Sequence, residues 1–344
     1  MRALVIHKAK DLRIEERQIP LAGPGQIKIK VAVGGICGSD LHYYNKGGFG
    51  PITLKEPMVP GHEFSGYADQ IGEGVDGFEL GELMVISPSR PCGDCRFCNE
   101  GLLNHCLNMR FYGSAMPYPH IQGAFQEELI VDASQCVRAE GLTPAEAAMA
   151  EPLSVALHAT LRAGEMLGKR VLITGCGPIG ALCIVAARRA GAAEIVVTDL
   201  VPNALQYALL AGADKVINMA EEPDGLSPYL ADKGSFDVLF ECTGAPQALA
   251  GAIPALRPRA VIMQLGLGGD MPVPMMQITA KELEIRGSFR FHEEFALAVK
   301  LMQSGLVDVK PLISHSFPID QAEQAFEVAS DRAQAMKTQI MFAN

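Results

Sequence analysis

The chain has 344 residues, 49% of them hydrophobic, and carries a formal net charge of −10 at pH 7. Single cores usually stop growing below this length, so we expect two domains that each bury a core of their own. The acidic balance argues against binding to nucleic acid, because a phosphate backbone selects basic surfaces. Neither an apolar stretch of ~20 residues nor an export signal is visible, so we expect a cytoplasmic protein without membrane contact.

The first 150 residues predict an antiparallel, barrel-like domain. Short strands bounded by Gly and Pro are expected at residues 3–6, 26–33, 63–71, 83–87 and 127–131. Strands of this length with frequent turn residues between them are typical of barrels and sandwiches.

A Gly-rich run within this domain carries Cys37, and another Gly precedes His62. Glycine neighbours would let both side chains approach a common centre without crowding. A catalytic zinc takes two or three protein ligands and keeps one position open, so Glu63 and Glu151 are candidates for the next ligand. A buried thiol near a structural histidine is the alternative. Spacing alone favours that alternative, because a Cys and a His this far apart form no recognised metal motif.

Four cysteines follow with the spacing C-x2-C-x2-C-x7-C, at Cys92, Cys95, Cys98 and Cys106. Four thiolates on turns satisfy the tetrahedral preference of zinc and leave no open position, so the predicted site is structural. An iron–sulfur cluster of the ferredoxin type would close with C-x3-C-P, which this run lacks. Disulfides would require an oxidising compartment, which we do not expect here.

From about residue 152 the pattern changes to strands that alternate with helices, which predicts a parallel sheet covered on both faces. Strands are expected at residues 170–174, 194–199, 215–217 and 236–241, with helices at 179–190 and 203–211.

The first of these strands runs into a G-x-G-x-x-G motif at Gly175, Gly177 and Gly180, and Asp199 ends the next strand. In a dinucleotide-binding fingerprint the glycines shape the turn under the pyrophosphate, the helix N-terminus faces the phosphates, and the carboxylate binds the adenosine ribose. Asp199 would repel a 2′-phosphate, and residues 200–204 contain no Arg or Lys, so the sequence favours NAD over NADP. An ordinary strand-turn-helix with a solvent-facing Asp199 is the alternative.

The chain is expected to return to the first domain after Arg290. Helices are predicted at residues 293–302 and 321–329, and a closing strand at 337–342. Such a return would leave a cleft between the two domains, where ligand sites are common.

Taken together, these motifs resemble the zinc-dependent medium-chain dehydrogenases along nearly the whole chain. The matching segments are 35–42, 61–63, the four-cysteine run and 175–180, in that order. The similarity is to the polyol and threonine dehydrogenase branch, because Glu151 stands where alcohol dehydrogenases proper carry a cysteine ligand. It implies an α/β fold with two domains. A GroES-like, β-barrel-type catalytic domain would span 1–150 and 290–344, with a structural zinc lobe at 88–110, and a Rossmann NAD-binding domain would span 151–289.

By this resemblance the protein is an NAD-dependent dehydrogenase with two zinc ions per chain. The catalytic zinc would be held by four positions, with the two glutamates as alternative direct or water-bridged ligands: Cys37, His62, Glu63 and Glu151. Ser39 and His42 would relay the substrate proton to solvent. Without the resemblance, Ser39 would be read as a turn residue and His42 as a surface histidine.

The resemblance also implies which residues contact cofactor and substrate. Cofactor contacts are expected at Gly175, Gly177, Pro178, Ile179, Gly180, Asp199, Thr243, Leu265, Gly266, Leu267, Ser288, Phe289 and Arg290. Substrate contacts are expected at Tyr43, Arg110, His120 and Arg290. A sugar acid carries a carboxylate, which a guanidinium group binds well, so the last three of these are the candidates to hold it. Arg110 and His120 lie in the segment with the closest match, so we expect these two to bind the acid group. Ordinary surface ion pairing is the alternative for a loop arginine.

We therefore expect an enzyme that interconverts a secondary alcohol of a sugar acid and the corresponding ketone. Phe291 stands where polyol dehydrogenases often have tyrosine, which argues against a neutral polyol as substrate. A sorbitol, xylitol or threonine dehydrogenase is the alternative within the family, and a cofactor-binding protein without catalysis is the alternative outside it. Analogy with the family also predicts a homodimer or homotetramer.

Overall fold

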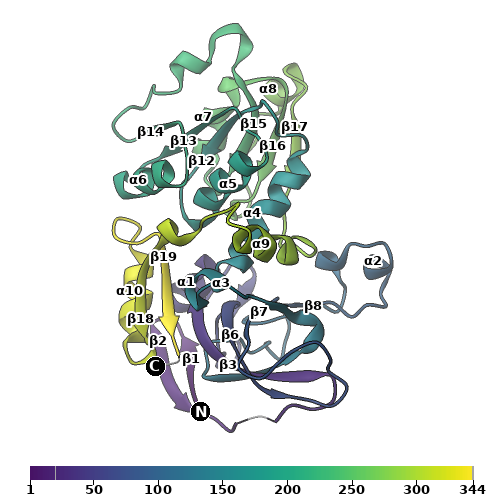
Figure 1. Cartoon of the computed structure of the whole chain (residues 1–344). Coiled ribbons are helices and arrows are strands. Elements are labelled where there is room, and N and C mark those ends of the chain that lie inside the picture. The colour runs from purple at the N-terminus through teal and green to yellow at the C-terminus, as the bar shows by residue number, and fades with distance from the viewer. Residues whose placement is uncertain (20, 343–344) are drawn as a thin grey trace.

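The molecule consists of two lobes, one built on a largely antiparallel sheet and the other on a parallel sheet (Figure 1). The structure is a computed structural model that describes residues 1–19 and 21–342. The two ends of the chain build the lower lobe in Figure 1, and the middle of the chain builds the upper lobe. No helix in the described part of the chain is long and apolar enough to span a bilayer.

The lower lobe contains a seven-stranded sheet in the order β11-β7-β6-β3-β19-β18, with β10 also paired to β3. Its strands are β3 (Gln26–Gly35), β6 (Glu63–Ile71), β7 (Leu83–Ile86), β10 (Glu128–Asp132), β11 (Cys136–Arg138), β18 (Ile313–Pro318) and β19 (Lys337–Met341). Two further strands, β1 (Arg2–Lys8) and β2 (Asp11–Glu16), pair antiparallel with each other and form a separate sheet. Burial alternates along β10, as expected for a strand with one face on the core. The five predicted strands of this domain are confirmed.

The C-terminal segment joins this sheet, as Figure 1 shows by the yellow strands beside the purple ones. β19 pairs antiparallel with β3, and β18 lies parallel to β19. The predicted helices correspond to α9 (Glu294–Gln303) and α10 (Ala322–Ser330). β18 was not predicted from the sequence.

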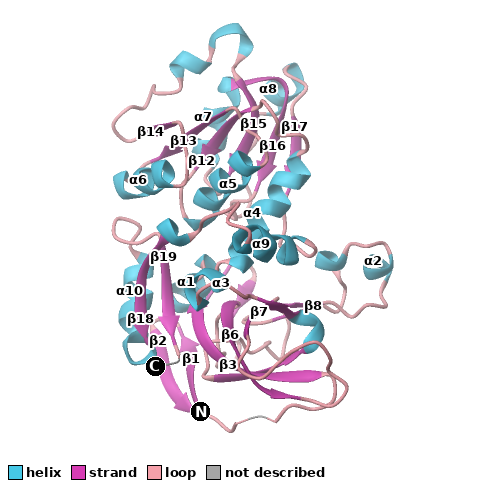
Figure 2. Cartoon of the chain, in the orientation of Figure 1, coloured by secondary structure: helices cyan, strands magenta, loops and turns pink. Residues whose placement is uncertain are grey.

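The upper lobe holds a six-stranded parallel sheet in the order β14-β13-β12-β15-β16-β17 (Figure 2). The strands are β12 (Arg170–Thr174), β13 (Glu194–Asp199), β14 (Lys215–Asn218), β15 (Phe236–Glu241), β16 (Leu256–Gln264) and β17 (Glu284–Gly287). The helices are α5 (Pro178–Arg189), α6 (Pro202–Leu210), α7 (Pro246–Ala252) and α8 (Met275–Ala280). This order, 3-2-1-4-5-6 in chain numbering, is that of a dinucleotide-binding Rossmann sheet. The predicted fold class is therefore confirmed.

Helices and short strands complete the lower lobe and the junction. These elements are α1 (Gly38–Lys46), α2 (Arg96–Asn99), α3 (Pro144–Ala148), α4 (Ala150–Ala163), β4 (Gly48–Phe49), β5 (Ile52–Thr53), β8 (Ser89–Arg90) and β9 (Arg110–Phe111). α4 packs against α5 of the upper lobe and also contacts β6 of the lower lobe, so it links the two lobes. The cysteine-rich segment around α2 projects away from the sheet (Figure 2).

Candidate active site

Three potential metal ligands converge on one point in the lower lobe. Atoms of Cys37, His62 and Glu63 that could bind a metal all lie within 4.8 Å of one another. Cys37 caps the N-terminus of α1, and Glu63 begins β6 directly after His62. Gly61, with φ of +94°, adopts a left-handed conformation, and a Cβ there would lie 2.1 Å from the Phe125 ring. Glycine at this position therefore sets the direction in which His62 leaves the loop.

The buried carboxylate of Asp40 fixes the two segments that carry these ligands. Its Oδ2 accepts a hydrogen bond from the Cys37 amide at 3.0 Å, and its Oδ1 accepts one from the Gly61 amide at 3.0 Å. The same Oδ1 lies 3.8 Å from Nδ1 of His62. That nitrogen is buried and has no hydrogen-bond partner among the described residues. Sequence reasoning missed Asp40, although an acid three positions after a cap residue is a recognisable capping signal.

Glu63 and Glu151 have different surroundings. Both carboxylate oxygens of Glu63 accept hydrogen bonds from Nζ of Lys337, at 2.8 and 2.6 Å, and both side chains are almost fully buried. Nζ of Lys337 also donates to the Ile36 carbonyl at 3.2 Å. Glu151 lies on α4 and is 5% exposed, and it is close enough to the metal-ligand cluster for the charges there to shift its pKa. Lys337 was expected only as part of a strand.

The donor set fits a divalent cation such as zinc. Burial, reinforced by the charge of Glu63, raises the pKa of Cys37 to about 12. Burial also raises the pKa of Glu151 to about 8. A bound cation would stabilise the anionic form of each group and reverse both shifts. One thiolate, one imidazole and a carboxylate are a zinc-like ligand set.

The four lobe cysteines form a second cluster, in which all four sulfur atoms lie within 4.8 Å of one another. Sγ–Sγ distances are 3.5 Å for Cys95–Cys98, 3.4 Å for Cys92–Cys106 and 4.0 Å for Cys95–Cys106. A tetrahedron with Zn–S bonds of ~2.3 Å has edges of about 3.8 Å, so the arrangement fits zinc. A hydrogen bond from the Leu107 amide helps to lower the pKa of Cys95 to about 6, whereas burial raises that of Cys98 to about 12. Within residues 1–19 and 21–342, none of the nine cysteines forms a disulfide in the structure.

The glycine motif shapes a turn between β12 and α5. Gly175 has φ of +82°, and a Cβ on Gly180 would lie 2.0 Å from the Gly175 carbonyl oxygen. A Cβ on Gly177 would meet no atom within 4 Å. The first and third glycines are therefore required by the protein itself, while the second leaves open space in front of the α5 N-terminus. This is the space that a pyrophosphate needs in the dinucleotide fingerprint.

The carboxylate of Asp199, at the end of β13, has four hydrogen-bond donors. Oδ1 accepts from the amides of Leu200 (2.7 Å) and Val201 (3.0 Å). Oδ2 accepts from the Cys176 amide at 2.7 Å and from Nη2 of Arg332 at 2.6 Å. The side chain of Asp199 is 2% exposed, whereas that of Arg332 is 54% exposed. The solvent-facing alternative for Asp199 therefore does not hold.

The other predicted cofactor contacts follow the carboxyl ends of β15, β16 and β17, so they lie along the same edge of the sheet. The buried carboxylate of Glu241 accepts from the amides of Thr243 (2.8 Å) and Gly244 (3.0 Å) and from Nε2 of Gln264 (2.6 Å). It thereby ties the loops after β15 and β16 together. Oγ of Ser288 is buried and has no partner within the described ranges. The edge thus presents a surface whose loops are fixed by hydrogen bonds.

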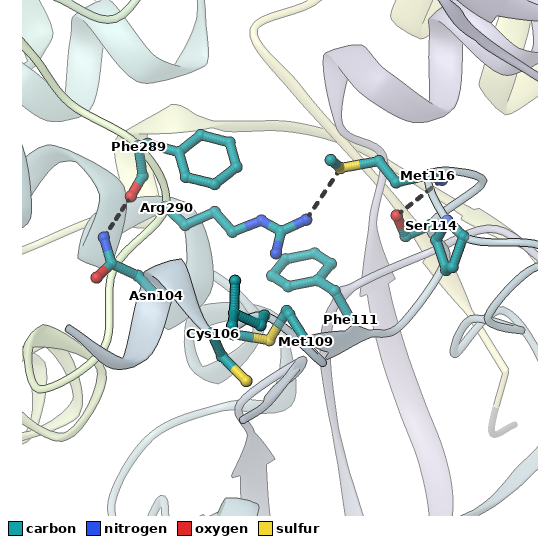
Figure 3. Close-up of a pocket in the computed structure, with 10 residues that line it drawn as sticks. Asn104, Cys106, Met109, Phe111, Ser114, Met116, Phe289 and Arg290 are labelled. Atoms are coloured by element: carbon teal, nitrogen blue, oxygen red, sulfur yellow. Dashed lines mark hydrogen bonds between the residues drawn. The ribbon is translucent and has the colours of Figure 1, made fainter. Parts of the chain in front are cut away.

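A cavity of about 280 Å³ lies where the cysteine lobe meets the loop after β17 (Figure 3). The guanidinium of Arg290 lies between two aromatic rings, 4.3 Å from the centroid of Phe111 and 4.9 Å from that of Phe289. Its Nη2 lies 3.5 Å from Sδ of Met116. Burial lowers the pKa of Arg290, while the nearby Glu151 and Tyr43 oppose this shift. The Phe111 ring also lies 5.5 Å from the ring of His62, so Arg290 lines the cavity and is separated from the metal-ligand cluster by one aromatic ring.

Asn104 of the lobe, in a 3-10 turn (Leu103–His105), supports this arrangement. Its amide nitrogen donates to the Phe289 carbonyl at 2.9 Å, and the ring of His105 stacks on Phe289 at 6.0 Å. Arg290 itself has φ of +56°, which is unfavourable for a residue with a side chain. The lobe therefore holds the loop that carries Arg290 in place.

The remaining predicted residues fall into two groups. Ser39 and His42 lie three positions apart on α1, so they share a face of the helix beside Cys37. Tyr43 is buried, with its hydroxyl accepting from the Ala115 amide at 3.1 Å.

Arg110 and His120 do not face the cavity. Arg110 is exposed between the cavity-lining residues Met109 and Phe111, so alternation along the strand directs it to the other side. Nε2 of His120 accepts from the Lys55 amide at 2.8 Å, and its Nδ1 lies 2.9 Å from the Pro117 carbonyl. Phe291 is fully buried and stacks on Phe295, so its ring belongs to the core.

Two family models match the chain. The alcohol dehydrogenase GroES-like domain matches residues 23–141, and the zinc-binding dehydrogenase model matches residues 178–304. The chain is 42% identical to the L-idonate 5-dehydrogenase (NAD(P)(+)) of Escherichia coli strain K12 over 346 aligned positions, covering 98% of both chains. It is 36% identical to human sorbitol dehydrogenase over 330 positions, covering 94% of this chain and 91% of the relative.

Solved structures agree with these matches. The crystal structure of the Escherichia coli L-idonate 5-dehydrogenase superposes with a TM-score of 0.94 at 40% identity, covering 99% of this chain and 97% of that one. An Escherichia coli CFT073 alcohol dehydrogenase complexed with NADH superposes with a TM-score of 0.90 at 29% identity, covering 99% of each chain. The resemblance predicted from the sequence is thereby confirmed. The chain belongs to the zinc-dependent medium-chain dehydrogenases, in the branch that contains the polyol dehydrogenases, and is an oxidoreductase.

Proposed function

We propose that this enzyme oxidises a secondary hydroxyl of a sugar acid, L-idonate to 5-keto-D-gluconate, and catalyses the reverse reduction. The observation that carries the proposal is the guanidinium of Arg290, held between Phe111 and Phe289 in the cavity near the metal-ligand cluster. Stacking holds the guanidinium in one orientation, and its N–H groups can donate in the guanidinium plane to a carboxylate. The name of the 42% identical relative supports the same substrate class.

We further propose two zinc ions per chain and NAD as a hydride acceptor. Cys37 and His62 would hold the catalytic zinc, with Glu63 and Glu151 as alternative direct or water-bridged ligands. Glu63 lies within 4.8 Å of the other two donors, and its bonds to Lys337 leave a second lone pair on each oxygen. The four lobe cysteines would hold the structural zinc. When bound, zinc supplies Lewis acidity toward a substrate oxygen and NAD supplies hydride acceptance.

The chain itself would supply orientation and proton transfer. Burial lowers the pKa of His42, so its imidazole is neutral at neutral pH and can accept a proton. Ser39, on the same face of α1 and closer to Cys37, would pass the proton from the substrate hydroxyl to His42. Arg290 would fix the carboxylate end of the substrate.

The experiment is a panel of aldonates and polyols assayed with NAD, followed by the absorbance of the reduced nicotinamide. We expect L-idonate to have the highest kcat/KM. Arg290→Ala should lower kcat/KM for L-idonate by about 10- to 100-fold, as expected for loss of a charge-assisted bond, and should change that for a polyol by much less. Arg290→Lys, which keeps the charge without the fork, should recover part of this loss.

Arg110→Ala is the matched control. Arg110 is an exposed arginine of β9, next to Phe111, and it does not line the cavity. It should leave both substrates within about threefold of wild type, as surface substitutions usually do. A polyol as the best substrate, or equal losses on aldonate and polyol in Arg290→Ala, would contradict the sugar-acid proposal and favour the sorbitol-type alternative.

A further inference from the structure

The adenosine-ribose end of the cofactor site contains a charged residue that the local sequence does not reveal. Asp199 is the carboxylate expected to meet the ribose, and a lone carboxylate there repels a 2′-phosphate. In this structure Arg332, from the loop between α10 and β19, binds it at 2.6 Å. The two residues are 133 positions apart and belong to different lobes.

The hydrogen bonds of Asp199 leave it little capacity for a further ligand. A carboxylate offers about four lone-pair sites, and three amides and Arg332 occupy four. Its negative charge is thus compensated by a guanidinium. A ribose hydroxyl could bind Asp199 only by taking the place of one of these donors.

The guanidinium of Arg332, by contrast, has N–H donors that form no hydrogen bond within the described ranges. Only Nη2 of Arg332 has a hydrogen-bond partner among the described residues, and the side chain is 54% exposed. The Arg332 carbonyl accepts from Nδ2 of Asn203, at the start of α6, at 3.3 Å. The neighbouring Asp331 carboxylate does not compete, because it accepts hydrogen bonds from within its own loop, from the Ala333 amide and the Gln334 side chain.

We propose that Arg332 is the residue through which the cofactor site accepts the 2′-phosphate of NADP, a cofactor that the name of the 42% identical relative includes beside NAD. Its free N–H groups bind the 2′-phosphate, and its contact with Asp199 removes the repulsion that the carboxylate would otherwise exert. The inference rests on the cofactor placement proposed above and is independent of the substrate.

Binding of cofactor fragments tests this directly. Adenosine 2′,5′-bisphosphate and 5′-AMP differ only in the 2′-phosphate, and isothermal titration of each into the zinc-loaded protein gives two dissociation constants. Wild type should bind the bisphosphate at least as tightly as 5′-AMP. Arg332→Ala should weaken the bisphosphate by about 10- to 100-fold and change 5′-AMP by less than about threefold. Arg332→Lys should recover part of the loss, and NADPH and NADH titrations followed by nicotinamide fluorescence should show the same pattern.

Arg257→Ala is the matched control. Arg257 pairs with Asp237 at the same distance, 2.6 Å, and its side chain is 45% exposed, but Asp237 lies near the start of β15, at the edge of the sheet away from the cofactor. It should leave both fragments unchanged. Equal weakening of both fragments in Arg332→Ala would assign Arg332 a purely structural role, and a wild-type protein that rejects the bisphosphate would also overturn the proposal. Neither result would bear on the sugar-acid substrate, because the fragments carry no nicotinamide and need no substrate.

Discussion

The buried ion pair between Lys337 and Glu63 allows a quantitative test of the metal-ligand cluster. Lys337→Met removes the charge and keeps most of the side-chain volume. It leaves the Glu63 carboxylate in a site where the side chains of the pair are only 2% and 1% exposed. Removing one partner of a buried pair costs about 3–5 kcal/mol, because the remaining charge is uncompensated. We expect a loss of this size in the free energy of unfolding, since both Glu63 oxygens lose their donor.

The assay is urea denaturation followed by circular dichroism, with a chelator present for wild type and variants so that no bound cation compensates the Glu63 charge. The double variant Lys337→Met/Glu63→Gln should recover most of the loss, because no buried charge remains. Lys310→Met is the control, because Lys310 pairs with Glu146 at 3.5 Å but is 65% exposed, and it should cost less than about 1 kcal/mol. If Lys337→Met costs no more than this control, or if the double variant is as unstable as the single one, the pair does not stabilise the cluster as argued.

Three further substitutions test Asp40, the cysteine lobe and the partly buried ion pair between His158 of α4 and Glu294 of α9. Asp40→Asn should weaken zinc binding at the Cys37–His62 site by about 10- to 100-fold in a chelator competition, because an amide cannot accept from both main-chain N–H groups; unchanged affinity would contradict the role of Asp40. Cys98→Ser should lower the zinc content by one ion per chain in elemental analysis, with Cys183→Ser, a buried thiol outside both clusters, as the control that keeps it. Glu294→Gln should destabilise the protein at pH 7 by on the order of 2 kcal/mol, because hydrogen bonds from His158 and main-chain amides overcome burial and lower the pKa of Glu294 to about 2. The pKa of Glu294 in the folded state lies below the unfolded value of ~4.5, so its contribution to stability is complete above about pH 5 and is lost as the pH falls toward 2. The variant should therefore show a flatter dependence of unfolding free energy on pH below pH 5. Parallel profiles for wild type and variant would refute the assignment.

The parts of the fold that the sequence predicted correctly are those whose signals are local. The glycine turn after β12 and the four-cysteine lobe are each defined within a few residues of one another, and both are in place in the structure. β16 and β17 were missed for a physical reason. β16 carries three exposed residues near its start, and β17 has no buried residue, so neither shows the apolar run expected of an inner parallel strand.

The residues that sequence reasoning missed are those whose partners are distant along the chain. Residues 200–204, which directly follow Asp199, contain no base that could bind a phosphate, whereas the arginine next to Asp199 in space is Arg332. Lys337 meets Glu63 across 274 positions. Arg110 and His120 lie in a segment that resembles the family, but neither lines the cavity. Strand alternation could have directed Arg110 outward, whereas the bonds of His120 depend on a loop conformation that sequence does not specify.

The return of the C-terminal segment to the first domain connects the two halves of the site. A short segment that runs from the end of α10 to the first residue of β19 carries two basic residues. Arg332 in this segment contacts Asp199, and Lys337 at its end contacts Glu63. β19 is fixed in the sheet by its pairing with β3, which leads through Gly35 to Cys37. Because β19 and β6 belong to the same sheet, a shift of one lobe against the other would change the Arg332–Asp199 contact, which joins the lobes, while leaving the Lys337–Glu63 pair intact.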